Sequence, residues 1–160
     1  MRWLWIDKFT EFTSRTSATT IKNVTMAEEH LHDLYPDFPI VPHSLIIEGM
    51  AQTAGILVGE ARNFQEKVIL AKVNRATFHR LVRPGDTLTL HAKMEQLSEQ
   101  GASTSGTVKI GNDLVAEIDL MFSHIDQNMA GLEFPDHNFV FTDQFTELLK
   151  GYRTNTPIQI

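Results

Sequence analysis

The sequence of 160 residues contains no cysteine. This absence excludes disulfide bonds, catalysis by a thiolate and zinc sites that need sulfur ligands. Long hydrophobic runs are also missing. No segment is apolar over the length needed to span a bilayer, and the opening MRWLWIDKF is too short for a signal peptide. We therefore expect a cytoplasmic protein.

Net positive charge is absent as well. Lysine and arginine number 14 against 20 acidic residues, and the formal net charge of −6 argues against non-specific binding to nucleic acid. The hydrophobic fraction of 42% is typical of an ordinary globular protein, and the length favours a single domain. We expect that domain over residues 1–124. Residues 125–160 form a C-terminal extension, in which 142–151 predicts a short amphipathic helix that packs on the domain and stops at Gly151.

Hydrophobic patterning predicts an α+β architecture. Residues 17–25 are rich in β-branched side chains and indicate a strand, whereas the three prolines within 26–43 indicate an irregular loop. Residues 44–61 are apolar almost all round, which is typical of a buried helix. Further strands are expected at 67–80, 87–97, 103–110 and 114–122, with a tight RPGD turn at 83–86. This order favours one antiparallel sheet around one helix.

The predicted helix carries a narrow polar stripe. Ser44, Glu48 and Gln52 are spaced four residues apart and therefore share one face. A carboxylate surrounded by apolar residues is costly to bury unless it has partners. The residues alone leave two interpretations open for Glu48: a structural acid bonded to the backbone or to Gln52, or a functional acid.

Four segments in this order resemble the hotdog-fold β-hydroxyacyl-acyl-carrier-protein dehydratases: WLWIDKF, IKNVT, FPIVPHSLIIEGMAQTAG and ATFHRLVRPGDTLTL. The match covers roughly residues 3–123. The resemblance implies a dimer in which each twisted sheet wraps a long central helix and the acyl chain lies in a tunnel at the subunit interface. It implies a lyase that dehydrates (3R)-hydroxyacyl thioesters in fatty-acid or polyketide-type synthesis. A loop histidine and a helix carboxylate would meet across the dimer, while a backbone N–H at the helix N-terminus polarises the thioester carbonyl.

Carrying the motif over residue by residue places Glu48 at the family's carboxylate and Gln52 at its glutamine. The family's histidine lies fourteen residues before the carboxylate, and that position is Leu34 here, followed by Tyr35. Where the family has His-Phe-Pro-Gly, this chain has LYPD, and the family's glycine at the helix start is His43. The resemblance therefore implies Glu48 as a catalytic residue but leaves the base unassigned, because leucine cannot accept a proton.

Nearby imidazoles are the candidates for the missing base. We take His43 first, since its ring could reach the tunnel mouth while its backbone N–H occupies the oxyanion position. We take His32 second, since an extended loop would point it to the same side as residue 34. His30 is a third candidate. A histidine in a polar loop is more commonly a surface or capping residue, and the HLHD fragment is too small to predict a metal site. We expect substrate contacts from Gln52, Ser44, Leu34 and Tyr35.

Three functions remain open at this level. They are the dehydratase, a hotdog acyl thioesterase in which the carboxylate activates water, and a non-catalytic acyl-binding protein or heterodimer partner subunit. The first needs no cofactor beyond the phosphopantetheine of acyl carrier protein or coenzyme A that carries the substrate. The assembly would be a homodimer, a trimer of dimers or a heterodimer with another hotdog subunit. Six basic residues fit either a solvated sheet edge or a docking patch for acyl carrier protein or for the phosphates of coenzyme A: Arg62, Lys67, Lys72, Arg75, Arg80 and Arg83.

Overall fold

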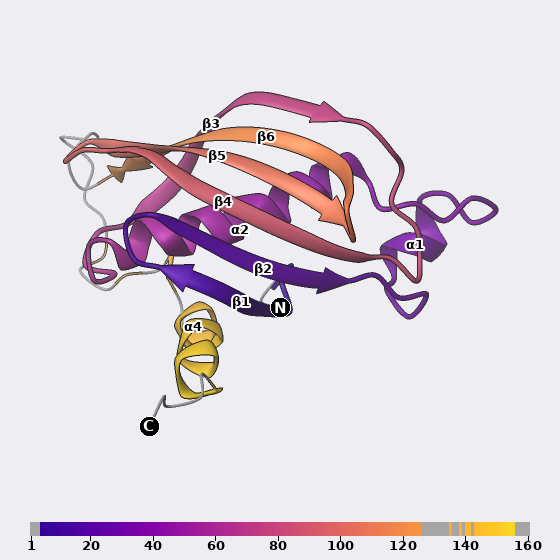
Figure 1. Cartoon of the computed structure of the whole chain (residues 1–160), viewed down its shortest axis with the longest axis horizontal. Coiled ribbons are helices and arrows are strands. Elements are labelled where there is room, and N and C mark those ends of the chain that lie inside the picture. The colour runs from indigo at the N-terminus through magenta and orange to yellow at the C-terminus, as the bar shows by residue number, and fades with distance from the viewer. Residues whose placement is uncertain (1–3, 126–134, 136–137, 139, 142, 156–160) are drawn as a thin grey trace.

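A six-stranded antiparallel sheet curls around one long helix (Figure 1). The computed structural model describes residues 4–125, 135, 138, 140–141 and 143–155. The strand order across the sheet is β1-β2-β4-β5-β6-β3. The strands are β1 (Lys8–Thr13), β2 (Ser17–Asn23), β3 (Val68–Phe78), β4 (Thr87–Leu97), β5 (Gly101–Ile110) and β6 (Asp113–His124), and the helices are α1 (His30–Asp33), α2 (His43–Glu60) and α4 (Asp143–Asn155). The predicted arrangement of one sheet around one helix is confirmed.

The main core lies between α2 and the sheet. On α2, Ile46, Met50, Ala54 and Val58 recur every four residues, so they form one face, and each is at most 1% exposed. They meet alternate residues of the strands, which are the positions that point to one side of a sheet. Burying each large aliphatic side chain contributes roughly 1.5–3 kcal/mol. This face of α2 is therefore what fixes the helix against the sheet.

The strands after α2 follow the predicted pattern. β3 is long and irregular, with register shifts between Leu70 and Lys72 and between Val73 and Arg75. The expected tight turn closes when the Asp86 N–H donates to the Arg83 carbonyl at 3.1 Å, and Gly85 takes a φ of 94°, which a side chain would strain. In β4 the alternation buries Leu88, Leu90 and Ala92 as expected.

Three local expectations were incomplete or wrong. Strand β1 was not predicted; it pairs with β2 through a turn in which Arg15 has a φ of 61°. The loop 26–43 contains one helical turn, α1, which buries Leu31 to 1% exposure. Helix α4 does not stop at Gly151 but runs to Asn155.

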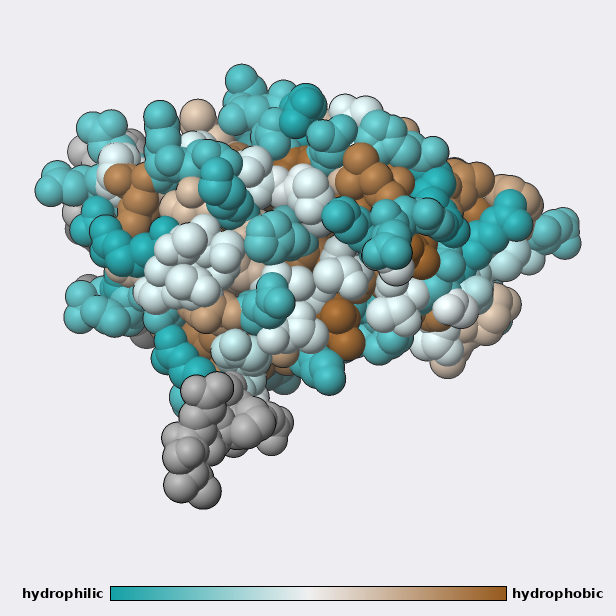
Figure 2. All heavy atoms as spheres, in the orientation of Figure 1, coloured by the Kyte–Doolittle hydropathy of each residue, from teal (hydrophilic) through white to brown (hydrophobic). Residues whose placement is uncertain are grey.

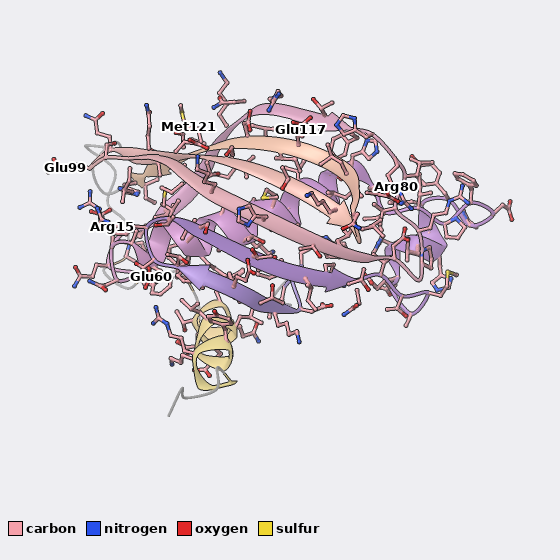
Figure 3. All side chains as sticks on the ribbon, in the orientation of Figure 1. Arg15, Glu60, Arg80, Glu99, Glu117 and Met121 are labelled. Atoms are coloured by element: carbon pink, nitrogen blue, oxygen red, sulfur yellow. The ribbon has the colours of Figure 1, made fainter. Side chains whose placement is uncertain are left out.

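Helix α4 packs on β1 and on the C-terminal half of α2 (Figure 1). Leu149 is 2% exposed and lies in a second apolar cluster with Phe9 and Leu57. Arg153, two residues after Gly151, donates to Glu60 at 2.6 Å. Because this contact holds the last turn of α4 against α2, the helix continues past Gly151. Figure 3 shows Glu60 at the end of α2 next to α4. The boundary expected at 124/125 stays a prediction, because residues 126–134 lie outside the described residues.

The two edges of the sheet are β1 and β3. Strand β3 is buried only at Val68, and every residue from Ile69 to Arg75 is exposed. Hydrophobic residues also reach the surface at the end of the molecule that holds α1 (Figure 2), where Leu34, Tyr35 and Phe38 are about half exposed. Over the described residues, no helix combines the length and apolar character needed to cross a membrane.

The packing of Phe141 on α2 can be tested at Gly59. A Cβ at this position would overlap the Phe141 ring, so Gly59→Ala should lower the free energy of unfolding by roughly 1–3 kcal/mol. In the Phe141→Ala background the same change should cost nothing or stabilise, because the ring is gone and alanine favours the helix. Urea denaturation of the four proteins measures this coupling.

Gly55→Ala is the matched control on the same helix, because its added Cβ would lie at an ordinary 3.5 Å from the Phe122 ring. Equal costs of Gly59→Ala with and without Phe141 would show that the ring does not rest on α2.

Candidate active site

Glu48 lies in the N-terminal half of α2 and is half-buried. Its Oε1 accepts a hydrogen bond of 2.7 Å from Nε2 of Gln52, one turn later. The Gln52 Oε1 in turn accepts the backbone N–H of Trp5 at 2.7 Å. Because a main-chain N–H can only donate, the Gln52 oxygen must face Trp5 and its amide N–H must face Glu48. The predicted polar stripe is thus a directed hydrogen-bond chain that fixes the carboxylate.

The carboxylate faces a pocket of about 270 Å³ between α2 and β3. Glu48 and Gln52 are the polar side chains among the described residues that line it. The remaining lining is apolar and comes from α2, β3, β6 and the C-terminal extension: Ala51, Gly55, Ile56, Val68, Ile69, Leu70, Phe122, Val140, Phe141 and Phe145. A pocket with one polar end and apolar walls suits a molecule with a polar head and a hydrocarbon tail.

The N-terminus of α2 is open. Pro42 is the N-cap residue and provides no side-chain cap, and its carbonyl accepts the N–H groups of Leu45 at 3.0 Å and Ile46 at 3.4 Å. The N–H groups of His43 and Ser44 precede these bonds and lack an intrahelical acceptor. Both residues are exposed. This end of the helix can therefore donate to an oxyanion, with the helix dipole adding to the effect.

The structure does not join His43 or His32 to Glu48 within one chain. The His43 ring stacks on Phe78 with centroids 3.9 Å apart, and five residues of helix turn its Cα about 140° away from that of Glu48. The His32 Nε2 donates to the Met26 carbonyl. The expected extended geometry around His32 was wrong, because α1 is helical there. Among the described residues, no imidazole hydrogen-bonds Glu48, so both catalytic assignments stay predictions.

His30 is the histidine that shares a neighbour with the Glu48 chain. Its ring meets that of Trp5 edge-on, with centroids 5.1 Å apart, and Nδ1 lies 3.9 Å from Glu28 Oε2. Burial lowers the pKa of His30, an effect that the Glu28 carboxylate opposes. Trp5 itself was missed as a site residue by sequence reasoning. Its two links to the site, a backbone N–H and a ring contact, leave no signal in a sequence pattern.

The other predicted substrate contacts are dispersed. Gln52 lines the pocket, but Ser44, Leu34 and Tyr35 are not among the described residues that do. Leu34 is the C-cap residue of α1 and is 54% exposed, and Tyr35 is 51% exposed. Within one chain, position 34 therefore presents a hydrophobic side chain to the surface. Its role at a site stays a prediction.

Three of the six basic residues that were candidates for a docking patch are either paired with an aspartate or buried. Arg75 donates to Asp119 at 2.9 Å, and Arg80, labelled in Figure 3, donates to Asp113 at 3.2 Å. Lys67 is 7% exposed. These contacts fit the solvated sheet edge better than a free cationic patch.

Within the part of the chain that the structure describes, no three metal-ligating side chains form a group.

Comparison with known proteins gives one family. The model of the FabA-like domain matches residues 2–119. The 3-hydroxyacyl-acyl-carrier-protein dehydratase FabZ of Caldanaerobacter subterraneus subsp. tengcongensis is 35% identical over 120 residues, covering 74% of this chain and 85% of that protein. The FabZ of Clostridioides difficile is 33% identical over 125 residues, covering 78% and 88%.

Solved structures agree on the fold at low identity. The dehydratase heterocomplex ApeI:P from Xenorhabdus doucetiae gives a TM-score of 0.62 at 14% identity, covering 79% of this chain and 90% of that one. Thioesterase HI1161 from Haemophilus influenzae gives 0.59 at 15% identity, covering 72% and 75%. These likenesses confirm the predicted hotdog fold and carry no argument beyond it.

The Gln52 bridge can be tested by replacing it with an isosteric apolar residue. Gln52→Leu removes the acceptor of the Trp5 N–H and the donor to Glu48, so we expect a loss of roughly 1–3 kcal/mol in the free energy of unfolding. Chemical denaturation measures the loss. Gln52→Glu keeps the acceptor for the Trp5 N–H but places a second carboxylate against Glu48, so it should also lower the free energy of unfolding, through the Glu48 contact alone. Unchanged stability in Gln52→Leu would show that the chain of bonds is not formed.

Proposed function

This chain belongs to the family of FabA-like domains, and on that premise we propose that it is a hydro-lyase that interconverts 3-hydroxyacyl and 2-enoyl thioesters. The observation that carries the proposal is Glu48. The resemblance assigns this residue to the family's carboxylate position, Gln52 hydrogen-bonds it, and among the described residues these two are the polar side chains of an otherwise apolar pocket. The curated relatives support a place in fatty-acid synthesis and acyl carrier protein as the carrier, with a coenzyme A thioester as the simpler substitute.

Dehydration of a 3-hydroxyacyl thioester requires a group that protonates the leaving hydroxyl. Dehydration breaks the C–H bond next to the thioester carbonyl and the C–O bond one carbon further. A carbon–carbon double bond forms, and the hydroxyl leaves as water once it is protonated. We assign that protonation to the Glu48 carboxyl group, which Gln52 holds toward the pocket. The base takes the proton from carbon, and transfer of that proton to the Glu48 carboxylate restores the acid. No oxidant or reductant is consumed, so no redox cofactor is needed.

The carbonyl oxygen gains negative charge as the C–H bond breaks. The free N–H groups of His43 and Ser44 at the start of α2 are the donors we propose for it. They belong to the same helix as Glu48, so the helix fixes the oxyanion donors relative to the acid. In this arrangement the His43 backbone N–H is an oxyanion donor, and the His43 ring remains our first candidate for the base.

The reaction also requires a base that removes the proton from carbon. Position 34 is leucine, and neither His43 nor His32 hydrogen-bonds Glu48 within one chain. We propose that the base reaches Glu48 across a subunit interface, with His43 ahead of His32. The exposed edge strand β3 and the half-buried Glu48 beside it suit pairing with a second subunit, because an unpaired edge offers a row of free N–H and C=O groups. A homodimer is our proposal, alone or as a trimer of dimers.

A second candidate follows from the exposed Leu34. If this chain has lost its own base, the complete site would need a heterodimer partner subunit, another hotdog chain with a histidine in that position. The chain would then supply Glu48 and the pocket. An acyl thioesterase fits less well, since the curated relatives are dehydratases.

The role of Glu48 is tested by Glu48→Gln, which keeps the shape and removes the acid. Hydration of crotonyl thioester should fall by about 10²–10⁴-fold while the melting temperature stays within a few degrees. Glu117→Gln is the matched control, since Glu117 lies on β6 away from the pocket and is labelled in Figure 3. Full hydration activity in Glu48→Gln would exclude the proposal, and release of free thiol from a saturated acyl thioester would indicate the thioesterase.

The missing base is tested by Leu34→His. If the chain is a dehydratase that has lost its base, crotonyl hydration should rise by about 10²-fold or more, the usual contribution of a positioned base. Because Leu34 is 54% exposed, the change should leave the free energy of unfolding nearly unaltered. Substantial activity in the parent chain that His43→Gln abolishes, with no gain from Leu34→His, would assign the base to His43 instead.

A further inference from the structure

The C-terminal extension is fastened to the domain next to the pocket. The Asn138 side chain donates to the carbonyls of Phe64 at 2.9 Å and Glu66 at 3.1 Å, just after α2. Its Oδ1 accepts the N–H groups of Val140 at 3.0 Å and Phe141 at 3.1 Å. One amide therefore ties the extension to the segment between α2 and β3, using both its donor and its acceptor.

Phe141 is the residue that this anchor positions. Its ring lies over Gly59, where no Cβ would fit, and meets the Phe64 ring edge-on with centroids 5.1 Å apart. Gly59 lies eleven residues after Glu48, which is about 16 Å along the helix axis. Phe141 thus lies near the C-terminal end of α2, more than two turns from the carboxylate.

Phe145 is held by α4, which has anchors of its own. Leu149 is 2% exposed against Phe9 and Leu57, and Arg153 donates to Glu60 at 2.6 Å. Phe145 is half-buried on this helix. Figure 1 shows α4 against β1, below the end of α2 that carries Gly59.

Both rings line the pocket that Glu48 faces. The α2 residues that line it run from Glu48 to Ile56, a length of about 12 Å. Glu48 lies at the N-terminal end of this span, Gln52 lies halfway along it, and Phe141 lies beyond its C-terminal end. The volume of about 270 Å³ lies just below the range of roughly 300–1,000 Å³ that is usual for small-molecule sites. Neither ring belongs to residues 2–119, which the FabA-like model matches.

We propose that Phe141 and Phe145 form the end wall of the acyl pocket and restrict the protein to short acyl chains. The inference rests on the proposed function, since it takes the pocket as the site of the acyl tail. The C-terminal extension is then a specificity element: it closes the pocket at the end opposite Glu48 with two aromatic side chains. Removing either ring lengthens the pocket without touching Glu48 or Gln52.

The test compares short and long substrates in ring-deleted variants. With crotonyl and trans-decenoyl coenzyme A, Phe141→Ala should raise the ratio of kcat/KM for the long substrate to that for the short one by about 10-fold or more. Phe145→Ala should change the ratio in the same direction. Leu148→Ala is the matched control, because Leu148 lies half-buried on the same helix and faces the groove between α4 and β1. It should leave the ratio unchanged.

A binding measurement separates this inference from the proposed reaction. In the Glu48→Gln background, calorimetry with butyryl and decanoyl coenzyme A should show that Phe141→Ala tightens decanoyl binding relative to butyryl. If Phe141→Ala tightens decanoyl binding but the parent chain has no hydratase activity, the pocket-wall proposal is supported and the proposed hydro-lyase function is wrong. The pocket-wall proposal is wrong, and the hydro-lyase function is supported, if hydratase activity shows the same chain-length ratio in the parent, Phe141→Ala and Phe145→Ala proteins. Thermal melting must show that all three proteins are folded.

Discussion

The burial of α2 against the curved sheet is the constraint on which the rest of this structure depends. A helix that is apolar almost all round must be covered on most sides, and the sheet covers the face of Ile46, Met50, Ala54 and Val58. Glu48 then lies beside the edge strand β3, in the pocket between α2 and that strand. The same packing that stabilises the domain therefore decides where a carboxylate can meet a ligand.

Gln52 satisfies the hydrogen-bonding needs of the proposed catalytic acid on a buried helix. A carboxylate on such a helix needs a donor, and a buried amide needs both of its ends satisfied. Gln52 meets the first need with its N–H group and the second by accepting from Trp5, whose chain segment precedes β1. The orientation of Glu48 thus depends on the N-terminal segment, which the sequence places more than forty residues away.

The two ends of α2 divide the work of the proposed site. At the N-terminal end, the free N–H groups and Glu48 would bind the polar part of a thioester. Toward the C-terminal end, Phe141 and Phe145 would limit the hydrocarbon part. Leu34, where the resemblance places the family histidine, lies outside this helix as the C-cap residue of α1, and it is not among the described residues that line the pocket. The pocket would therefore bind an acyl group whether the base comes from His43 or from a partner subunit.

The sequence by itself determined the sheet around one helix, the tight turn at 83–86 and the shared face of Glu48 and Gln52. These follow from local periodicity and turn chemistry, which act over a few residues. It did not determine β1, the helical turn α1, the continuation of α4 past Gly151, or the part played by Trp5. Each of these depends on contacts between distant segments: pairing with β2, burial of Leu31, the Arg153–Glu60 ion pair and the Trp5–Gln52 hydrogen bond. Only the tertiary structure brought Val140, Phe141 and Phe145 to the pocket, because nothing in their local pattern specifies which groove their side chains will fill.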